Sequence, residues 1–228
     1  MPELEIIAHI HTDFPEKFGI PRQSGLVPEL AGKIIFQEKY RREEAFRGLE
    51  EFSHIWMLWQ FSKALRQDWT PSVRPPKLGG NARKGVFATR SPFRPNGIGL
   101  SCVKLDAITH EKENGPVLYV SGIDMMDGTP IYDIKPYLPY ADSRPNASCG
   151  FADCEDQDSL TVSIPSSCAE NIPGKRLSAL TQLLAQDPRP AYQTDASRIY
   201  GLSYAGYEVK FRVEENTLYV MSIEQQLN

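Results

Sequence analysis

Short apolar runs separated by turn-forming residues make up most of this chain, and only one segment has the periodicity of a long amphipathic helix. Runs of this length bounded by Gly, Pro and polar residues are typical of β-strands. The predicted strands are residues 4–10, 33–37, 53–61, 86–89, 98–108, 117–123, 160–164, 207–213 and 217–223. The predicted helix is 175–186, where Leu177, Leu180, Leu183 and Leu184 recur at helical spacing. The chain is therefore expected to be mainly β.

Two pairs of these strands are expected to form hairpins. Gly115-Pro116 favours a turn between 98–108 and 117–123, and the segment Glu214-Glu215-Asn216 joins the last two strands. Residues 125–147 contain four prolines, which predicts an ordered loop and no regular strand or helix. Residues 146–159 are small and acidic and are predicted to be a linker. The expected organisation is a mainly β domain over 1–145 and a small α+β domain over 160–228.

Composition excludes several classes of protein. No apolar run approaches the length of a membrane span, and the N-terminus lacks the pattern of a secretory signal, so we expect no membrane partner. The four cysteines match no Cys-x-x-Cys site, which predicts free thiols and a cytoplasmic location. His9 and His11 would share a strand face and offer two metal ligands. Because no third ligand is evident nearby, no metal is expected.

The charge distribution is strongly polarised along the chain. The net charge is −4, but residues 63–104 hold nine Lys and Arg and one acid, Asp68, and so carry +8, whereas the rest carries −12. Such a chain can present one positive face to a polyanion such as RNA, although a set of solvated surface charges is the alternative interpretation.

Familiar catalytic motifs are absent. The chain has no G-x-G-x-x-G after a strand, no P-loop and no G-x-S-x-G segment, which argues against a Rossmann nucleotide site and against a serine hydrolase. The segment from Arg90 to Ser101, RSPFRPNGIGLS, is instead the candidate centre of a site. Its basic first half belongs to the positive window, and its second half enters the predicted strand 98–108.

Several long motifs, in this order, resemble the TsaA-like family and its bacterial TrmO branch. They are KFGIPRQSGL, SHIW, VRPPKLGGNARKGVFATRSPFRPNGIGLS, DGTPIYDIKPYLPYADS and, near the end, DPRPAY. The resemblance implies a small β-barrel that binds S-adenosylmethionine, working as a homodimer with cofactor sites near the subunit interface. It also implies N6-methylation of the threonylcarbamoyl-adenosine beside the anticodon of threonine tRNA.

The resemblance also implies a set of cofactor contacts. These fall on Pro21, Arg22, Gln23, Ser62, Lys63, Arg90, Leu100, Gly128, Thr129, Pro130 and Ile131. Asp127 joins them on chemical grounds, because its carboxylate can accept ribose hydroxyls or face the sulfonium. Ser62-Lys63 stands where the family is expected to have His-Gln-like residues, so only backbone contacts are carried over there. As alternatives, Pro21 and Pro130 shape turns, Leu100 belongs to the core and Asp127 is a turn former.

RNA recognition and proton transfer suggest further residues. The predicted phosphate contacts are Arg66, Arg74, Arg83, Lys84 and Arg94. Stacking of a splayed base could use Phe93, Tyr132, Tyr137 or Tyr140, with core packing as the alternative. Asp127, Asp133 and Tyr137 are candidates for a proton acceptor, and none is assigned. Asp187, Arg189 and Tyr192 either contact RNA or brace the nearby helix.

Two other functions compete with tRNA methylation. The first is methyl transfer to a small molecule, against which the positive window argues. The second is a non-catalytic RNA-binding module, against which the complete cofactor motifs argue.

Overall fold

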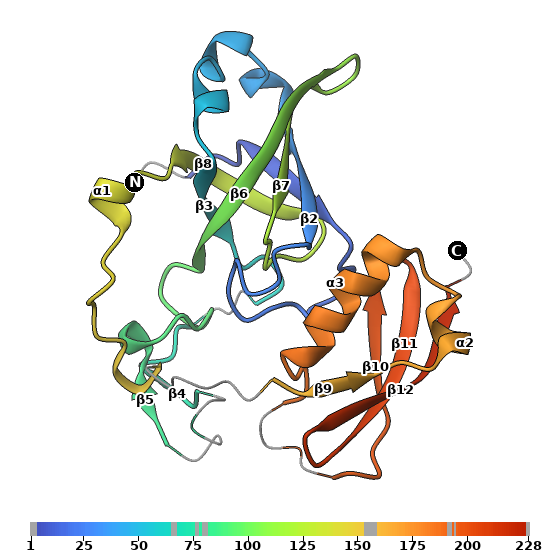
Figure 1. The fold of residues 1–228 in the computed structure, drawn as a ribbon. Helices are drawn as coiled ribbons and strands as arrows, with labels where there is room; N and C mark the ends of the chain where they lie inside the picture. The colour runs from blue at the N-terminus through green and yellow to red at the C-terminus, as the bar shows by residue number, and fades with distance from the viewer. Residues whose placement is uncertain are drawn as a thin grey trace.

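The computed structural model of the chain describes residues 4–64, 68–75, 78, 82–152, 159–190, 193 and 195–226. Its centre is a closed barrel of six antiparallel strands in the order β1-β2-β7-β6-β3-β8 (Figure 1). The barrel strands are β1 (Ala8–Thr12), β2 (Ala31–Phe36), β3 (His54–Gln60), β6 (Ile98–Glu111), β7 (Gly115–Ser121) and β8 (Thr129–Pro136). The prediction of a mainly β chain with a small barrel is confirmed.

Short elements connect and flank these strands. Between β2 and β3 run three 3-10 helices, and a two-stranded ribbon lies between β3 and β6. Two further short helices follow β8. In chain order, the short elements are η1 (Glu38–Tyr40), η2 (Glu43–Ala45), η3 (Leu49–Glu51), β4 (Ser72–Val73), β5 (Lys84–Gly85), η5 (Val86–Ala88), α1 (Pro139–Asp142) and η6 (Gly150–Ala152). In the described part of the chain, none of the helices has the length and apolarity needed to cross a bilayer.

The C-terminal part is a four-stranded sheet that lies beside the barrel, with α3 across it (Figure 1). Its elements are β9 (Thr161–Ser163), α2 (Ser166–Ala169), α3 (Gly174–Ala185), β10 (Tyr200–Tyr204), β11 (Tyr207–Glu214) and β12 (Thr217–Gln225). The predicted helix is confirmed, because α3 buries Leu180, Leu183 and Leu184. Both predicted hairpins, β6–β7 and β11–β12, are also present.

Alternating burial explains how the barrel closes. On β3, Ile55, Met57 and Trp59 point inward between more exposed neighbours. On β6, by contrast, the inward residues at the start of the strand are Gly99 and Ser101, while Leu100 is 52% exposed. Gly99 lies under the indole of Trp59, where a Cβ atom would approach to 2.3 Å. A glycine is therefore required for the ring to lie flat against this strand.

Two expectations about local structure are wrong. Residues 129–136 form the barrel strand β8 and residues 139–142 form the short helix α1, although we expected residues 125–147 to be a loop without regular structure. Pro139 is tolerated in α1 because it stands at the start of the helix. Pairing of β8 with β3 begins at Ile131 and ends at Pro136, so Pro130 precedes that ladder, and a strand tolerates proline at such an end position. Residues 86–89 do not form a strand, because Thr89 donates through its backbone N–H (3.1 Å) and its hydroxyl (2.9 Å) to the Val86 carbonyl and closes a turn.

Candidate functional site

A cavity of about 490 Å³ lies where β3 ends and β6 begins. Its walls come from the loop before β2, the turn after β3, the segment before β6 and the segment before β8, so residues far apart in the sequence meet there. This volume suits a nucleotide-sized ligand. The lining residues are Lys17, Ile20, Pro21, Arg22, Gln23, Trp59, Gln60, Phe61, Ser62, Lys63, Ala64, Thr89, Arg90, Pro92, Arg94, Ile98, Gly99, Leu100, Asp124, Met125, Met126 and Thr129.

Eight of the twelve residues predicted to contact the cofactor line this cavity: Pro21, Arg22, Gln23, Ser62, Lys63, Arg90, Leu100 and Thr129. Arg94, a predicted phosphate contact, lines it as well. Leu100 faces the cavity from the outer side of β6, so it is not a core residue. The structure therefore gathers most of the set into one place, and their contacts with a cofactor stay a prediction.

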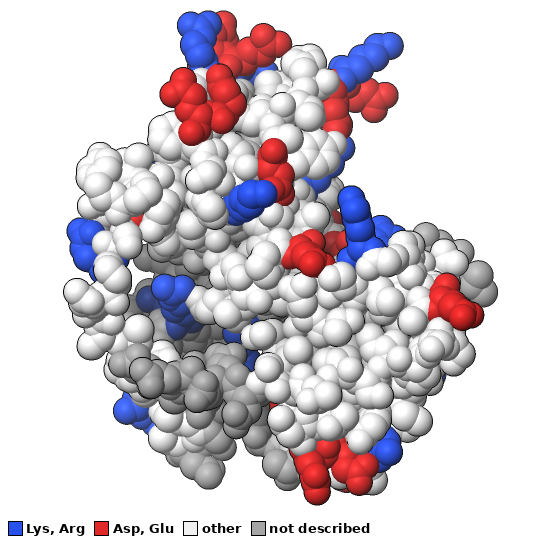
Figure 2. All heavy atoms as spheres, in the orientation of Figure 1, with Lys and Arg blue, Asp and Glu red and all other residues white. Residues whose placement is uncertain are grey.

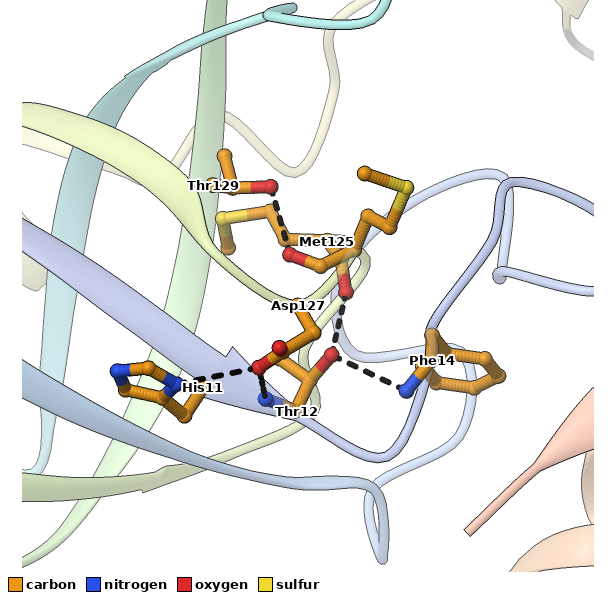
Figure 3. Close-up of polar contacts among 7 residues, drawn as sticks. His11, Thr12, Phe14, Met125, Asp127 and Thr129 are labelled. Carbon is orange, nitrogen blue, oxygen red and sulfur yellow. Dashed lines mark hydrogen bonds and ion pairs between the residues drawn. The ribbon is translucent and has the colours of Figure 1, made fainter. Parts of the chain in front are cut away.

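The other four residues, Asp127, Gly128, Pro130 and Ile131, lie outside the lining. Pro130 and Ile131 are buried within β8. Gly128 has a φ of +72°, which explains the need for glycine in the turn before that strand. Asp127 points toward β1, where its Oδ1 accepts the backbone N–H of Thr12 at 3.0 Å (Figure 3).

The turn around Asp127 is fastened to the end of β1. His11 Nδ1 lies 3.3 Å from the same Asp127 oxygen, and the Thr12 hydroxyl donates to the Met125 carbonyl at 3.1 Å (Figure 3). The Thr129 hydroxyl donates to the Met126 carbonyl at 2.6 Å. These bonds fix the backbone of the two methionines that line the cavity, so Asp127 supports the cavity wall from behind.

Asp124 is a charged cavity residue that the sequence motifs did not indicate. The Ser101 hydroxyl donates to Asp124 Oδ1 at 2.6 Å, and the indole N–H of Trp59 donates to the same hydroxyl at 2.9 Å. Burial raises the pKa of Asp124 to about 6, against the lowering effects of the Ser101 hydroxyl, backbone N–H groups and the nearby Arg90. The available signal was an acid placed directly after the apolar run 117–123.

Cationic groups surround the rest of the cavity. Arg90 Nη1 donates to Gln23 Oε1, and Lys17 Nζ donates to the carbonyl of Lys63, which ties two walls together. Arg94 Nη1 donates to the Thr89 carbonyl at 3.0 Å. Asp124 is the single carboxylate among these cavity-lining residues of the described chain.

An aromatic pair provides part of the apolar wall of the cavity. The rings of Trp59 and Phe61 lie 4.3 Å apart between centroids, with an interplanar angle of 58°. Electron-rich ring faces of this kind can hold a flat base or a positively charged group.

Of the predicted phosphate contacts, Arg94 lines the cavity, and Arg74, Arg83 and Lys84 lie on or next to the β4–β5 ribbon. Arg74 and Arg83 are exposed, and Lys84 is partly exposed on β5. Figure 2 shows Lys and Arg on the part of this face around β4 and β5, whereas near η1–η3 and at the outer end of the C-terminal sheet it shows acidic and basic side chains together. Arg66 lies outside the described residues.

The other candidate residues have local partners. Asp133 Oδ2 lies 2.7 Å from Lys135 Nζ, and the ring of Tyr137 packs against those of His54 and Trp56. Neither Asp133 nor Tyr137 lines the cavity. In the described part of the chain, no group of three or more His, Cys, Asp and Glu is placed to hold a metal.

The motif after α3 contains an ion pair. Arg189 donates to both carboxylate oxygens of Asp187 at 2.8 Å, and its side chain is 15% exposed. Of the two interpretations left open for this pair, the geometry favours support of the chain that leaves α3. Tyr192 lies outside the described residues.

Comparison with known proteins agrees with this arrangement. Residues 9–143 match the model of the tRNA-methyltransferase O N-terminal domain, and residues 159–226 match that of the TrmO C-terminal domain. The chain belongs to the TrmO family.

Similar proteins support this membership over nearly the full length of the chain. The tRNA (adenine(37)-N6)-methyltransferase of Escherichia coli is 41% identical, with 97% of each chain covered. A protein of Pseudomonas aeruginosa, named putative S-adenosylmethionine-dependent methyltransferase RcsF, is 43% identical over 86% of each chain. A crystal structure of TrmO from P. aeruginosa matches with a TM-score of 0.79 at 34% identity, covering 99% of this chain and 97% of that one.

Proposed function

We propose that this chain methylates N6 of the adenine at position 37 of tRNA, using S-adenosylmethionine as the methyl donor. The observation that carries the proposal is a cavity with cationic, acidic and aromatic walls in a chain of the TrmO family. The substrate we propose in particular is threonylcarbamoyl-adenosine in threonine tRNA, as the sequence motifs imply.

The residues present fit the chemistry of this cofactor. S-adenosylmethionine has a base, an amino-acid end with one carboxylate and one ammonium group, and a positively charged sulfur that activates its methyl group for transfer. Arg90 and Asp124 both line the cavity and carry opposite charges. The positive charge of Arg90 acts to lower the pKa of the Asp124 carboxyl, which shows that the two groups lie near each other. We infer that Arg90 holds the carboxylate and Asp124 the ammonium group.

The remaining walls suit the rest of the molecule. The Trp59–Phe61 pair offers ring faces to the adenine or to the charged sulfur. Leu100, Met125 and Met126 add apolar surface that excludes water. Transfer of this kind gains most from holding the two reacting atoms in line at contact distance, which a rigid barrel rim can do.

Nucleoside analysis tests the proposed reaction directly. The purified protein is incubated with S-adenosylmethionine and threonine tRNA, with or without the threonylcarbamoyl group, and the digested nucleosides are measured by mass spectrometry. We expect one added methyl group on threonylcarbamoyl-adenosine and none on unmodified adenosine. Methylation of both tRNAs would reject the narrower substrate, and methylation of neither would reject the function.

We further propose that the protein acts in the cytoplasm as a homodimer. Cys102, Cys149 and Cys168 are free thiols, as is usual in a reducing compartment. Light scattering during gel filtration should give twice the chain mass of 25.7 kDa. A mass of one chain at micromolar concentration would contradict the dimer.

A further inference from the structure

Two large aromatic side chains lie exposed against each other beside the cavity. Trp69 is 47% exposed and Phe87 is 72% exposed, and their rings are stacked, with centroids 6.0 Å apart and an interplanar angle of 23°. Leaving two flat apolar side chains together in water costs free energy that their burial elsewhere would recover. Exposed apolar surface of this kind commonly marks a binding site.

Backbone hydrogen bonds hold the pair in place. The N–H of Thr70 donates to the Phe93 carbonyl at 3.1 Å, and the N–H of Val86 donates to the Pro71 carbonyl at 3.0 Å. Val86 is 1% exposed, so its burial anchors η5 while the next residue, Phe87, points outward. The two rings are therefore presented by tethered backbone, which lowers the conformational entropy lost when a ligand binds.

The surroundings of the pair are basic and adjoin the cavity. Arg83 and Lys84 come shortly before Phe87 in the chain, at the strand β5. Arg74 directly follows β4, the other strand of the ribbon. Thr89, two residues after Phe87, already lines the cavity, and two Cα–Cα steps span at most about 7.6 Å. The backbone of Phe87 is thus within about 7.6 Å of a cavity-lining residue, so the platform and the cavity belong to one continuous stretch of chain.

We propose that Trp69 and Phe87 form a stacking platform for an unpaired base of the anticodon loop next to the methylated adenine. The proposal rests on the tRNA substrate proposed above and adds the residues that grip its single-stranded part. Flat aromatic faces bind unpaired bases of any sequence by stacking, and nearby cations neutralise the phosphates between those bases. A double helix keeps its bases stacked on each other and offers no free face to this platform.

Substitutions at Phe87 separate stacking from simple apolar contact. Phe87→Ala and Phe87→Leu remove the ring, whereas Phe87→Tyr keeps it, and Met221→Ala on β12 is a matched exposed control at 51% exposure. We expect the Ala and Leu variants to bind an anticodon stem-loop RNA about 5- to 100-fold more weakly. The Tyr and Met221 variants should bind it as the wild type does, and blunt duplex RNA should not distinguish any of them.

Kinetics give a second, independent readout. The Ala variant should raise KM for tRNA by a similar factor, with kcat at saturating tRNA and the Kd for S-adenosylmethionine unchanged. Equal RNA binding by wild type, Ala and Leu variants would overturn the platform, as would full rescue by Leu. A loss of the dimer in the Ala variant would instead assign the pair to the subunit contact and overturn it too.

The experimental outcomes distinguish a failure of the platform from a failure of the proposed function. Absence of methyl transfer by the wild type would reject the function, yet ring-dependent binding of the stem-loop would still support the platform. Normal transfer with unchanged KM in the Ala variant would reject only the platform. Trp69→Ala and Trp69→Phe repeat the comparison at the other ring.

Discussion

The Asp124 carboxyl group has a pKa raised to about 6 by burial, above its ordinary value of 3.8. At pH values between these two, the folded chain keeps a proton that the unfolded chain releases, so stability falls as pH rises through this range. Asp124→Asn, which stays neutral, should raise the free energy of unfolding by about 3 kcal/mol at pH 8 and leave it nearly unchanged below pH 4. Urea unfolding at both pH values measures this, and an equal gain at both would exclude titration as the cause.

Arg90 should matter for binding and little for stability. Its side chain is exposed and has one described side-chain partner, Gln23, so Arg90→Ala should change the free energy of unfolding by less than about 0.5 kcal/mol. Loss of a charged hydrogen bond to a carboxylate should weaken S-adenosylmethionine binding about 10- to 100-fold, and transfer should fall with it.

Calorimetry and the nucleoside assay measure both effects of Arg90→Ala. Arg212→Ala on β11 is the matched control, because this arginine is also partly exposed and pairs with Glu214 away from the cavity. Full activity of the Arg90 variant would mean that the amino-acid end of the cofactor is held elsewhere.

The start of β6 shows where reasoning from single residues fails. Alternation predicts that every second residue of a strand shares a face. It does not predict which face is buried when one face carries glycine and serine and the other carries leucine. Gly99 and Ser101 are inward because the Trp59 ring needs the space and its N–H needs a partner. That partner, Ser101 on the neighbouring strand, lies 42 residues away in sequence, so the hydrogen-bonded chain that reaches Asp124 was not predictable from local pattern.

Among the larger elements, strong periodicity gave correct predictions, whereas proline content led to the wrong prediction of a loop at β8. The hairpins and α3 follow from local pattern, because turn residues and apolar spacing agree there. β8 could not be predicted, because its place between β1 and β3 is set by closure of the barrel. Pro136 ends the ladder with β3 and Pro130 lies before that ladder, although Pro130 pairs with His9 of β1.

The C-terminal sheet supports one wall of the cavity. Phe14 packs on Tyr204 with ring centroids 5.4 Å apart, and the N–H of Ala205 donates to the Asp13 carbonyl at 2.8 Å. Further along the same loop, Gly19 has a φ of +87° and lies so close to Leu202 that a Cβ atom would approach its Cδ1 to 2.1 Å. The loop therefore reaches Pro21 in a path that β10 dictates.

Gly19→Ala should disturb both stability and the cavity. The left-handed backbone costs about 1–2 kcal/mol for alanine, and overpacking on Leu202 adds about 1–3 kcal/mol. Gly48→Ala is the matched control, because its φ is +84° and nothing lies within 4 Å of the added atom. We expect denaturant unfolding to show the larger loss for Gly19→Ala, and only this variant to weaken S-adenosylmethionine binding. Equal losses of unfolding free energy in the two variants would show that the Leu202 side chain moves aside at no cost.

For the molecule as a whole, charge was the most informative property of the sequence. The positive window 63–104 supplies Arg90 and Arg94 to the cavity and Arg83 and Lys84 to the ribbon beside it. The sequence could not show that these cations surround a hollow, because the cavity forms from four separate segments. The division into domains at 145 and 160 stays a prediction, and the two family matches, 9–143 and 159–226, fall on either side of the expected linker.

Salt dependence tests whether this charged face binds RNA. Each phosphate of a single strand that is neutralised by Lys or Arg adds about −0.7 to the slope of log K against log salt concentration. If Arg74, Arg83, Lys84 and Arg94 all contact phosphates, the slope for tRNA should be about −3. Replacing Arg83 and Lys84 together by Gln should make it shallower by about 1.4.

The control substitution is Lys210→Gln on β11, an exposed lysine of the C-terminal sheet, which should leave the slope unchanged. Filter binding of tRNA over a range of potassium chloride concentrations gives the slopes. A slope near zero in the wild type would mean that RNA phosphates do not meet this face. A steep slope that is unchanged in the double variant would place the phosphate contacts on other cations of the molecule. The excess of Lys and Arg in residues 63–104 would then contribute to the cavity and not to RNA binding at the ribbon.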